Sequence, residues 1–316
     1  MWTSLLALLA LDPLAINLRV ERFPVLDDQA IVAHCVTLER GFTLFGSNGF
    51  GGVSAMRIAD DRAIAVTDVG TVFDFDLQRD AAGFVSAFGP ATPHYLLDTD
   101  GERLNKANGD SEGLILLDDR TALISFENMN RIDRYHRAEG DWHPDATIFE
   151  TDDARLGRND GFETIVQLAD GRVMALAEGK GADGWSPLWI SHHGLNGPWR
   201  ESAYQAADEF NPTDADIDPA TGDLIVLERA FSRTKGVRAR LVRVPAGDLD
   251  KNRLIGTELA RMSFLHGIDN MEAIEVERAP DGRLIAHLMS DDNFNDIQRT
   301  VFLGISIAET PECGAK

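Results

Sequence analysis

Apolar and polar residues alternate in five segments that share one plan: a short apolar strand, a tight polar turn and a second apolar strand. The segments are VSAMRIADDRAIAVTD (53–68), EGLILLDDRTALISFE (112–127), ETIVQLADGRVMALAE (163–178), DADIDPATGDLIVLER (214–229) and EAIEVERAPDGRLIAHLMSDD (272–292). The turn reads Asp-Asp-Arg or Asp-Gly-Arg in four of them. Because Asp-Gly between alternating apolar positions favours a tight hairpin turn, the pattern predicts five β-hairpins.

The five hairpins recur at a nearly constant interval. Equivalent turn positions, at Arg62, Arg120, Arg172, Asp223 and Arg283, are 51 to 60 residues apart. Each hairpin is followed by room for two more strands, and repeats of four strands are typical of β-propeller blades. The pattern therefore predicts an all-β fold, a β-propeller in which residues 18–316 form a single domain.

Five blades account for the visible repeats, and six remain possible if the N-terminal segment forms a degenerate blade. The last repeat ends after TVFLGISIA (300–308), so its outer strand is missing from the end of the chain. We expect LRVERFPV (18–25) or VTLERGFTLF (36–45) to supply it, which closes the ring and removes an exposed sheet edge. In that arrangement Cys35 and Cys313 could form a disulfide across a very long loop, the alternative being two separate thiols.

The first 17 residues differ from the rest of the chain. Residues 1–16 are apolar, and no Lys or Arg occurs before Arg19. The segment is similar to the apolar part of a secretory signal peptide without its basic start. We interpret it as a signal-peptide remnant and expect a periplasmic or secreted protein.

The net charge of the chain limits the kinds of molecule that it can bind. The formal net charge is −22, which disfavours binding to nucleic acid and anionic membranes. No apolar run reaches the roughly 20 residues that a membrane-spanning helix needs. We expect a monomer that acts on a small anionic molecule, and the acidic balance suits a protein that binds divalent cations.

Carboxylates recur at two places in each repeat, the start of the first hairpin strand and the end of the second. Those considered as metal ligands are Asp68, Glu112, Glu127, Glu163, Glu178, Asp216, Glu228, Glu272 and Asp291. Both places lie at the same end of a hairpin, and the innermost strands of a propeller converge on its channel. The acids are therefore predicted to form one ring at the channel mouth, able to hold hard cations or to act as acid–base pairs.

The alternative is that each acid has only a structural role, and pairs with a nearby arginine or caps a backbone amide. Against it stands the cost of gathering so many carboxylates without cations. Arg131, Arg229 and Arg299 lie close to the acids in sequence and could instead bind an anionic substrate.

Several stretches resemble the phytase-like family, named for the esterase-like activity of phytase. They are GGVSAMR (51–57), TDVG (67–70), DSEGL (110–114), SFENMNRIDRY (125–135), NDGFET (159–164), LERAF (227–231), DNMEA (269–273) and SDDNFNDIQRT (290–300). The resemblance implies a propeller, export and a phosphoester-hydrolase activity that rests on the Glu and Asp positions. The sequence departs from the family pattern at Ala273 and Thr164, where glycine is expected.

These observations lead to one hypothesis and two alternatives. The hypothesis is a metal-dependent hydrolase of a phosphomonoester or phosphodiester, with Ca²⁺ as cofactor and with Glu112, Glu163, Glu272 and Asp291 as ligands or general base. The alternatives are a non-catalytic propeller that binds a ligand or protein, and a lactonase-like carboxylic ester hydrolase. A serine-esterase mechanism is disfavoured because the chain has no Gly-x-Ser-x-Gly motif.

Overall fold

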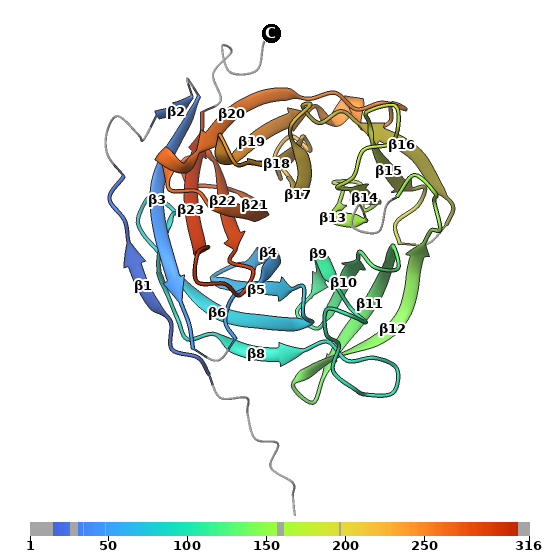
Figure 1. The fold of residues 1–316 in the computed structure, drawn as a ribbon, viewed down its shortest axis with the longest axis horizontal. Helices are drawn as coiled ribbons and strands as arrows, with labels where there is room; N and C mark the ends of the chain where they lie inside the picture. Colours follow the sequence, from blue (N-terminus) through green and yellow to red (C-terminus); the bar gives the residue numbers. More distant parts are fainter. Residues whose placement is uncertain are drawn as a thin grey trace, which may run out of the picture.

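The computed structural model describes residues 15–25, 31–33, 35–47, 49–156, 161–195 and 197–308. Five antiparallel sheets stand around a central channel like the blades of a propeller (Figure 1). The innermost strands of the five sheets are β4, β9, β13, β17 and β21. The predicted five-blade propeller is confirmed.

The first three blades follow the chain in order. Blade 1 contains β4 (Val53–Ala59), β5 (Arg62–Thr67), β6 (Thr71–Arg79), β7 (Val85–Phe88) and β8 (Thr92–Tyr95), which pairs with β6. Blade 2 contains β9 (Ser111–Asp118), β10 (Thr121–Phe126), β11 (Arg131–Ala138) and β12 (Asp141–Glu150). Blade 3 contains β13 (Phe162–Gln167), β14 (Val173–Ala177), β15 (Ser186–Ser191) and β16 (Trp199–Tyr204).

Blade 4 follows the chain in order, whereas blade 5 combines strands from the beginning and the end of the chain. Blade 4 contains β17 (Asn211–Ile217), β18 (Leu224–Ser232), β19 (Gly236–Val244) and β20 (Thr257–Ser263), with short 3-10 turns η1 (Ala246–Asp248) and η2 (Phe264–His266). Blade 5 contains β21 (Asn270–Arg278), β22 (Leu284–Asp291), β23 (Thr300–Ile307), β3 (Val36–Phe45), β1 (Arg19–Arg22) and β2 (Ile31–Ala33). Strand β3 pairs with β23, so the outer part of this sheet comes from the beginning of the chain.

Apolar side chains fill the spaces between neighbouring blades. One buried cluster joins blades 1 and 2 through Ile64 and Leu114, and the next joins blades 2 and 3 through Leu123 and Phe162. Similar clusters lie between blades 3 and 4, 4 and 5, and 5 and 1. Because strand residues alternate between the two faces of a sheet, both faces of each inner hairpin can be apolar and buried.

The predicted hairpin turns join the two inner strands of each blade. In the β13–β14 turn, Gly171 has a φ of 84°, and in the β21–β22 turn Gly282 has a φ of 87°. This left-handed conformation favours glycine, which explains the Asp-Gly pairs of the sequence.

Two predictions fall partly outside the described residues. Cys313 lies outside them, so the Cys35–Cys313 disulfide stays a prediction. Of the apolar segment 1–17, only residues 15–17 are described, and Ile16 is buried, with its N–H 2.6 Å from the carbonyl oxygen of Ala91. No helix in the described part of the chain is long and apolar enough to cross a membrane.

A buried arginine, Arg57, links the inner strands of four blades. The Arg57 guanidinium, from β4 of blade 1, donates hydrogen bonds to both carboxylate oxygens of Asp214 in blade 4, at 3.0 and 3.2 Å. It also donates to the carbonyl oxygens of Ile165 in blade 3, at 3.2 Å, and of Ile274 in blade 5, at 3.0 Å. Burial opposes its charge, but Asp214 and Asp216 outweigh that effect and raise the pKa of Arg57 above its usual value.

The acidic run of β17 fastens blade 4 to blade 5. Asp214 accepts the Ile274 N–H at 2.9 Å, and Asp216 accepts the Val276 N–H at 2.7 Å. Asp218 continues the series by pairing with Arg278. Asp214 and Asp216 share one face of β17 because side chains alternate, and Asp218 directly follows the strand.

We expect Arg57→Met to lower the free energy of unfolding by about 3–5 kcal/mol, because it leaves Asp214 buried without its cation. Arg134→Ala, which removes an ion pair on the surface, should cost less than about 1 kcal/mol. Urea unfolding of both variants measures the difference. A loss for Arg57→Met no larger than for Arg134→Ala would show that the channel arginine is not a structural tie.

Candidate functional site

The inner hairpin of every blade contains a β-bulge at the same place near one end of the channel. In blades 1, 3, 4 and 5 the register with the second strand shifts at a single residue, and in blade 2 it shifts across residues 112–113. The equivalent residues are Ser54, Glu112, Glu163, Thr213 and Glu272, which we call the bulge ring. We call this end of the channel the mouth. Bulges turn a side chain out of the normal alternation, and they are frequent next to active sites.

A second set of equivalent residues comes one position after the second-strand residue that pairs with the residue just before each bulge. We call this set, made up of Asp68, Glu127, Glu178, Arg229 and Asp291, the rim ring. The register supports the equivalence, because Thr67, Phe126 and Ala177 pair with the residues just before the bulges of their blades. The structure thus brings acids from blades 1, 2, 3 and 5 to one mouth of the channel.

Blade 4 is the exception, and it corrects the repeat alignment by one residue. Pro212 pairs with Glu228, so the residue at the rim is Arg229 and the residue at the bulge is Thr213. On a strand, a shift of one residue turns the side chain to the opposite face. Glu228 is accordingly fully buried beneath the rim, where it accepts a hydrogen bond of 2.7 Å from the Tyr204 hydroxyl.

All ring residues except Thr213, whose hydroxyl donates to the Met271 carbonyl oxygen at 3.2 Å, line a pocket of about 230 Å³. It is lined by Ser54, Asp68, Lys106, Glu112, Glu127, Glu163, Glu178, Arg229, Asn270, Glu272, Asp291 and Asn293. Seven of these side chains are acidic and only two are basic. The pocket can therefore attract cations.

Burial and mutual repulsion raise the pKa values of five pocket carboxyls. Burial, followed by the nearby Asp110, raises the pKa of Glu127 to about 7. Burial raises the pKa of Glu272 to about 8 although Arg229 opposes the shift, and that of Asp291 to about 7. The pKa values of Glu112 and Glu163 lie well above the usual range, first through burial and then through neighbouring carboxylates.

Two basic side chains bind part of this acidic set. The Arg229 guanidinium lies 3.0 Å from Glu178 Oε1 and 3.2 Å from Glu272 Oε1. Lys106, on the loop before β9, places its Nζ 2.8 Å from both Asp68 Oδ2 and Asp110 Oδ1. Each cation thus bridges two acids from different parts of the chain.

Several carboxylate oxygens at the mouth are placed so that they could bind a hard metal ion. Asp110, Glu112 and Glu127 can offer ligand oxygens that all lie within 4.8 Å of one another. Asp68 Oδ1 and Glu272 Oε2 are buried and have no hydrogen-bond partner among the described residues. A buried carboxylate oxygen without a partner is costly, and oxygen ligands are those that Ca²⁺ and Mg²⁺ prefer.

Four residues predicted for the site do not line this pocket. Asp216 and Glu228 serve the contacts within and between blades described above. Arg131 lies on β11, where its Nε donates to Asp133 Oδ2 at 2.6 Å, and Arg299 is half-exposed and pairs with Asp269 at 3.3 Å. Of the three predicted arginines, Arg229 alone faces the pocket.

Some lining residues were not predicted. Lys106, Asn270 and Asn293 lie in loops or at strand ends, and no residue-type pattern in the sequence marks them. Ser54 could have been found, since it occupies in the first repeat the place that Glu112 and Glu163 occupy in the next two. The recurring pattern of acids does not include Ser54, because serine carries no carboxylate.

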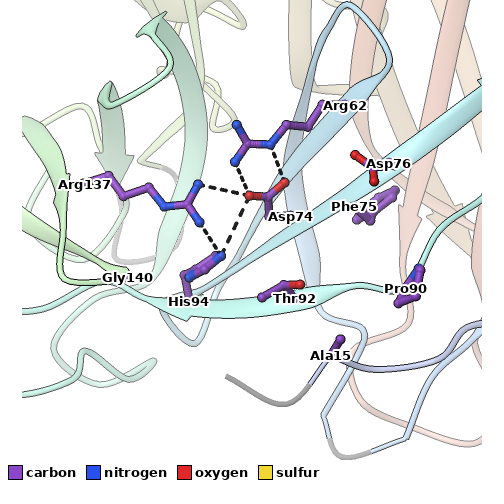
Figure 2. Close-up of a pocket in the computed structure, with 10 residues that line it drawn as sticks. All are labelled: Ala15, Arg62, Asp74, Phe75, Asp76, Pro90, Thr92, His94, Arg137 and Gly140. Atoms are coloured by element: carbon purple, nitrogen blue, oxygen red, sulfur yellow. Dashed lines mark hydrogen bonds and ion pairs between the residues drawn. The ribbon is translucent and has the colours of Figure 1, made fainter. Parts of the chain in front are cut away.

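A second pocket, of about 550 Å³, lies between blades 1 and 2. Figure 2 shows Asp74 between the guanidinium groups of Arg62 and Arg137, with His94 beside them. Burial and the nearby Arg137 lower the pKa of His94, whose Nε2 lies 2.6 Å from an Arg137 nitrogen. Arg62 and Arg137 are thus already paired with Asp74 and His94. The group is better explained as a contact that joins blades 1 and 2 than as a reaction site.

Comparison with known proteins places this site in a family. The family model described as "Esterase-like activity of phytase" matches residues 48–294, which include both rings. The chain belongs to the phytase-like family. The comparison with curated proteins found no match.

Solved propeller structures are only distantly similar to this phytase-like chain. The glutaminyl cyclase of Myxococcus xanthus is 11% identical, with a TM-score of 0.45, and the match covers 87% of this chain and 97% of that one. A glucose dehydrogenase is 11% identical, with a TM-score of 0.44 and coverage of 87% and 99%. A luciferin-regenerating enzyme is 11% identical, with a TM-score of 0.42 and coverage of 84% and 97%. At such values the likenesses carry no argument about activity.

The raised pKa values predict how stability depends on pH. Carboxyl groups titrate at about 4 in the unfolded chain, so between about pH 5 and 8 the folded protein holds more protons than the unfolded one. The free energy of unfolding therefore falls as pH rises through this window. With a chelator present, we expect the melting temperature to fall from pH 5 to pH 8, and Glu272→Gln to make the fall shallower.

Glu258→Gln is the matched control, because the pKa of Glu258 is lowered, with burial outweighed by Arg261 and Arg240, and it titrates below the window. It should retain the wild-type slope. If Glu272→Gln also retained that slope, the Glu272 carboxyl would not hold the extra proton.

Proposed function

We propose that the chain is an exported, Ca²⁺-dependent phosphoester hydrolase that acts at the acidic mouth pocket. The observation that carries the proposal is the pair of stacked rings, which gathers seven acidic side chains around about 230 Å³. The family match supports an ester-cleaving chemistry. Export rests on the apolar segment at residues 1–16.

Asp110, Glu112 and Glu127 are the residues that would hold the cation, because their oxygens already lie within 4.8 Å of one another. When bound there, a divalent cation polarises the phosphoryl oxygens and lowers the pKa of a water and of the surrounding carboxyls. Arg229 faces the same pocket, and its forked guanidinium suits a phosphate oxygen.

Glu163 is the proposed general base. It belongs to the bulge ring and lines the pocket, yet no group in the described part of the chain donates a hydrogen bond to its carboxylate. It can therefore take the proton of an attacking water. The water oxygen bonds to phosphorus as the bond from phosphorus to the ester oxygen breaks, and the ester oxygen keeps that electron pair and takes the proton from Glu163 to leave as the alcohol.

We expect purified protein, after chelation and return of Ca²⁺, to cleave p-nitrophenyl phosphate or bis(p-nitrophenyl) phosphate. Glu163→Gln should lower kcat by about 10²–10⁴-fold, the usual contribution of a general base. Asp145→Asn, on the outer surface of blade 2, is the control and should keep wild-type activity.

Each other result points elsewhere. Turnover of a p-nitrophenyl carboxylic ester alone would favour a lactonase-like hydrolase. No turnover, with Ca²⁺ still raising the melting temperature, would favour a binding propeller. Activity that is unchanged by Glu163→Gln would remove this residue from the base role.

Lys106 provides a separate test of the cation site. Its ammonium group lies 2.8 Å from Asp110 Oδ1, one of the proposed ligands, so it repels a divalent cation and competes for that oxygen. Lys106→Met should therefore raise the Ca²⁺ affinity, on the order of tenfold, as measured by titration calorimetry. Lys235→Met, which removes an ammonium group from an exposed ion pair with Glu209, should leave the affinity unchanged. Weaker Ca²⁺ binding by Lys106→Met would mean that Asp110 is not a ligand.

A further inference from the structure

Large apolar side chains are exposed mostly on one face of the propeller. Seven in the described part of the chain are exposed: Met129, Phe231, Ile255, Phe264, Leu265, Phe294 and Ile297. Five of them follow strands that end at the mouth, namely β10, β20 and β22, and Phe231 lies near the mouth end of β18. Ile255 precedes β20 at the opposite end. Most of the exposed apolar groups thus lie on the face of the propeller that carries the acidic pocket.

Phe294 is the member of this group that stands directly at the pocket. Its neighbour Asn293 lines the pocket, and its ring lies against Gly52, two residues before the pocket residue Ser54. A Cβ atom on Gly52 would lie 2.2 Å from the Phe294 ring, so the glycine makes room for the aromatic group. The Phe294 residue is nevertheless 46% exposed, which leaves part of the ring available to a ligand.

The backbone holds Phe294 in this place at a conformational cost. Asn293 and Phe294 both have a φ of 49°, and a bulky residue rarely adopts this left-handed conformation. Asp292 fixes the loop, because its Oδ1 accepts the N–H groups of Phe294 and Gly52, each at 3.0 Å. Its Oδ2 accepts the hydroxyl of Thr300 at 3.0 Å. Strain of this kind persists where surrounding contacts impose it, and it is concentrated at ligand sites.

The charge of the pocket limits what can bind beside this ring. Among the described residues, Lys106 and Arg229 are the only basic side chains that line the pocket, and each already bridges two acids. A ligand with many phosphates would meet seven acidic side chains and would need a cation for nearly every phosphate. A single phosphate with an apolar substituent needs few cations and can place its substituent on the exposed ring.

We propose that the site selects phosphate esters of an apolar alcohol, aryl or alkyl, and that Phe294 is the residue that recognises the apolar group. The inference rests on the proposed function, since it assumes that the phosphate binds in the mouth pocket. Aromatic and alkyl groups gain affinity by leaving water for the face or edge of a phenyl ring.

The test compares the binding of phenylphosphonate and methylphosphonate, which carry the same charged group and are not hydrolysed, in the presence of Ca²⁺. Titration calorimetry should show that the wild-type protein binds phenylphosphonate about tenfold more tightly, or better. Phe294→Asn should abolish this preference and leave methylphosphonate binding unchanged. Asparagine suits the variant because it tolerates the left-handed backbone and so preserves the loop.

Two controls sharpen the comparison. Phe294→Leu retains an apolar side chain and should retain most of the preference, whereas Ile255→Ala, at the opposite end, should bind like the wild type. Equal binding of the two phosphonates by the wild type, or a preference that survives in Phe294→Asn, would overturn the inference, as would no binding of either. A phenyl preference without any turnover of phosphate esters would sustain this inference while the proposed hydrolase activity fails.

Discussion

The arrangement of the channel depends on one buried cation. Arg57 extends from the inner strand of blade 1 and hydrogen-bonds to the inner strands of blades 3, 4 and 5. It satisfies backbone carbonyls that would otherwise face the channel, and it balances the buried charge of Asp214. The inner strands are thereby held together below the mouth. The hydrogen bonds of Arg57 hold these strands together although their mouth ends carry carboxylates that repel one another.

The site itself arises from a repeated irregularity of the backbone. A regular strand would send every second side chain into an apolar interface between blades, but the bulges turn Glu112, Glu163 and Glu272 toward the pocket. The rim acids follow from where the second strands end. Burial raises the pKa values of the rim acids Glu127 and Asp291 and of the three bulge acids, so their charged forms are costly at neutral pH and favour a bound cation.

Much of this organisation could be read from the sequence, because hairpin turns and apolar alternation depend on local residue types. The five repeats and the acids of blades 1, 2, 3 and 5 were found in this way. Blade 4 was misaligned by one position, because its rim residue is Arg229 and the neighbouring Glu228 fits the acidic pattern equally well. Only the register of β17 with β18 separates the two. Lys106 and Asn293 escaped prediction because loop geometry brings them to the pocket.

The odd blade has a consequence for any ligand that enters the mouth. A ring of five equal carboxylates would look the same after each turn of one fifth, and a small molecule could bind in five equivalent orientations. Blade 4 breaks that equivalence, because Arg229 places a positive group on one side and Thr213, at the bulge, carries no carboxylate. Phe294 follows β22 of blade 5, so an apolar group stands at a different part of the pocket wall from the positive Arg229. An unsymmetrical ligand can therefore be held in one orientation, which the attack of a water along a defined direction requires.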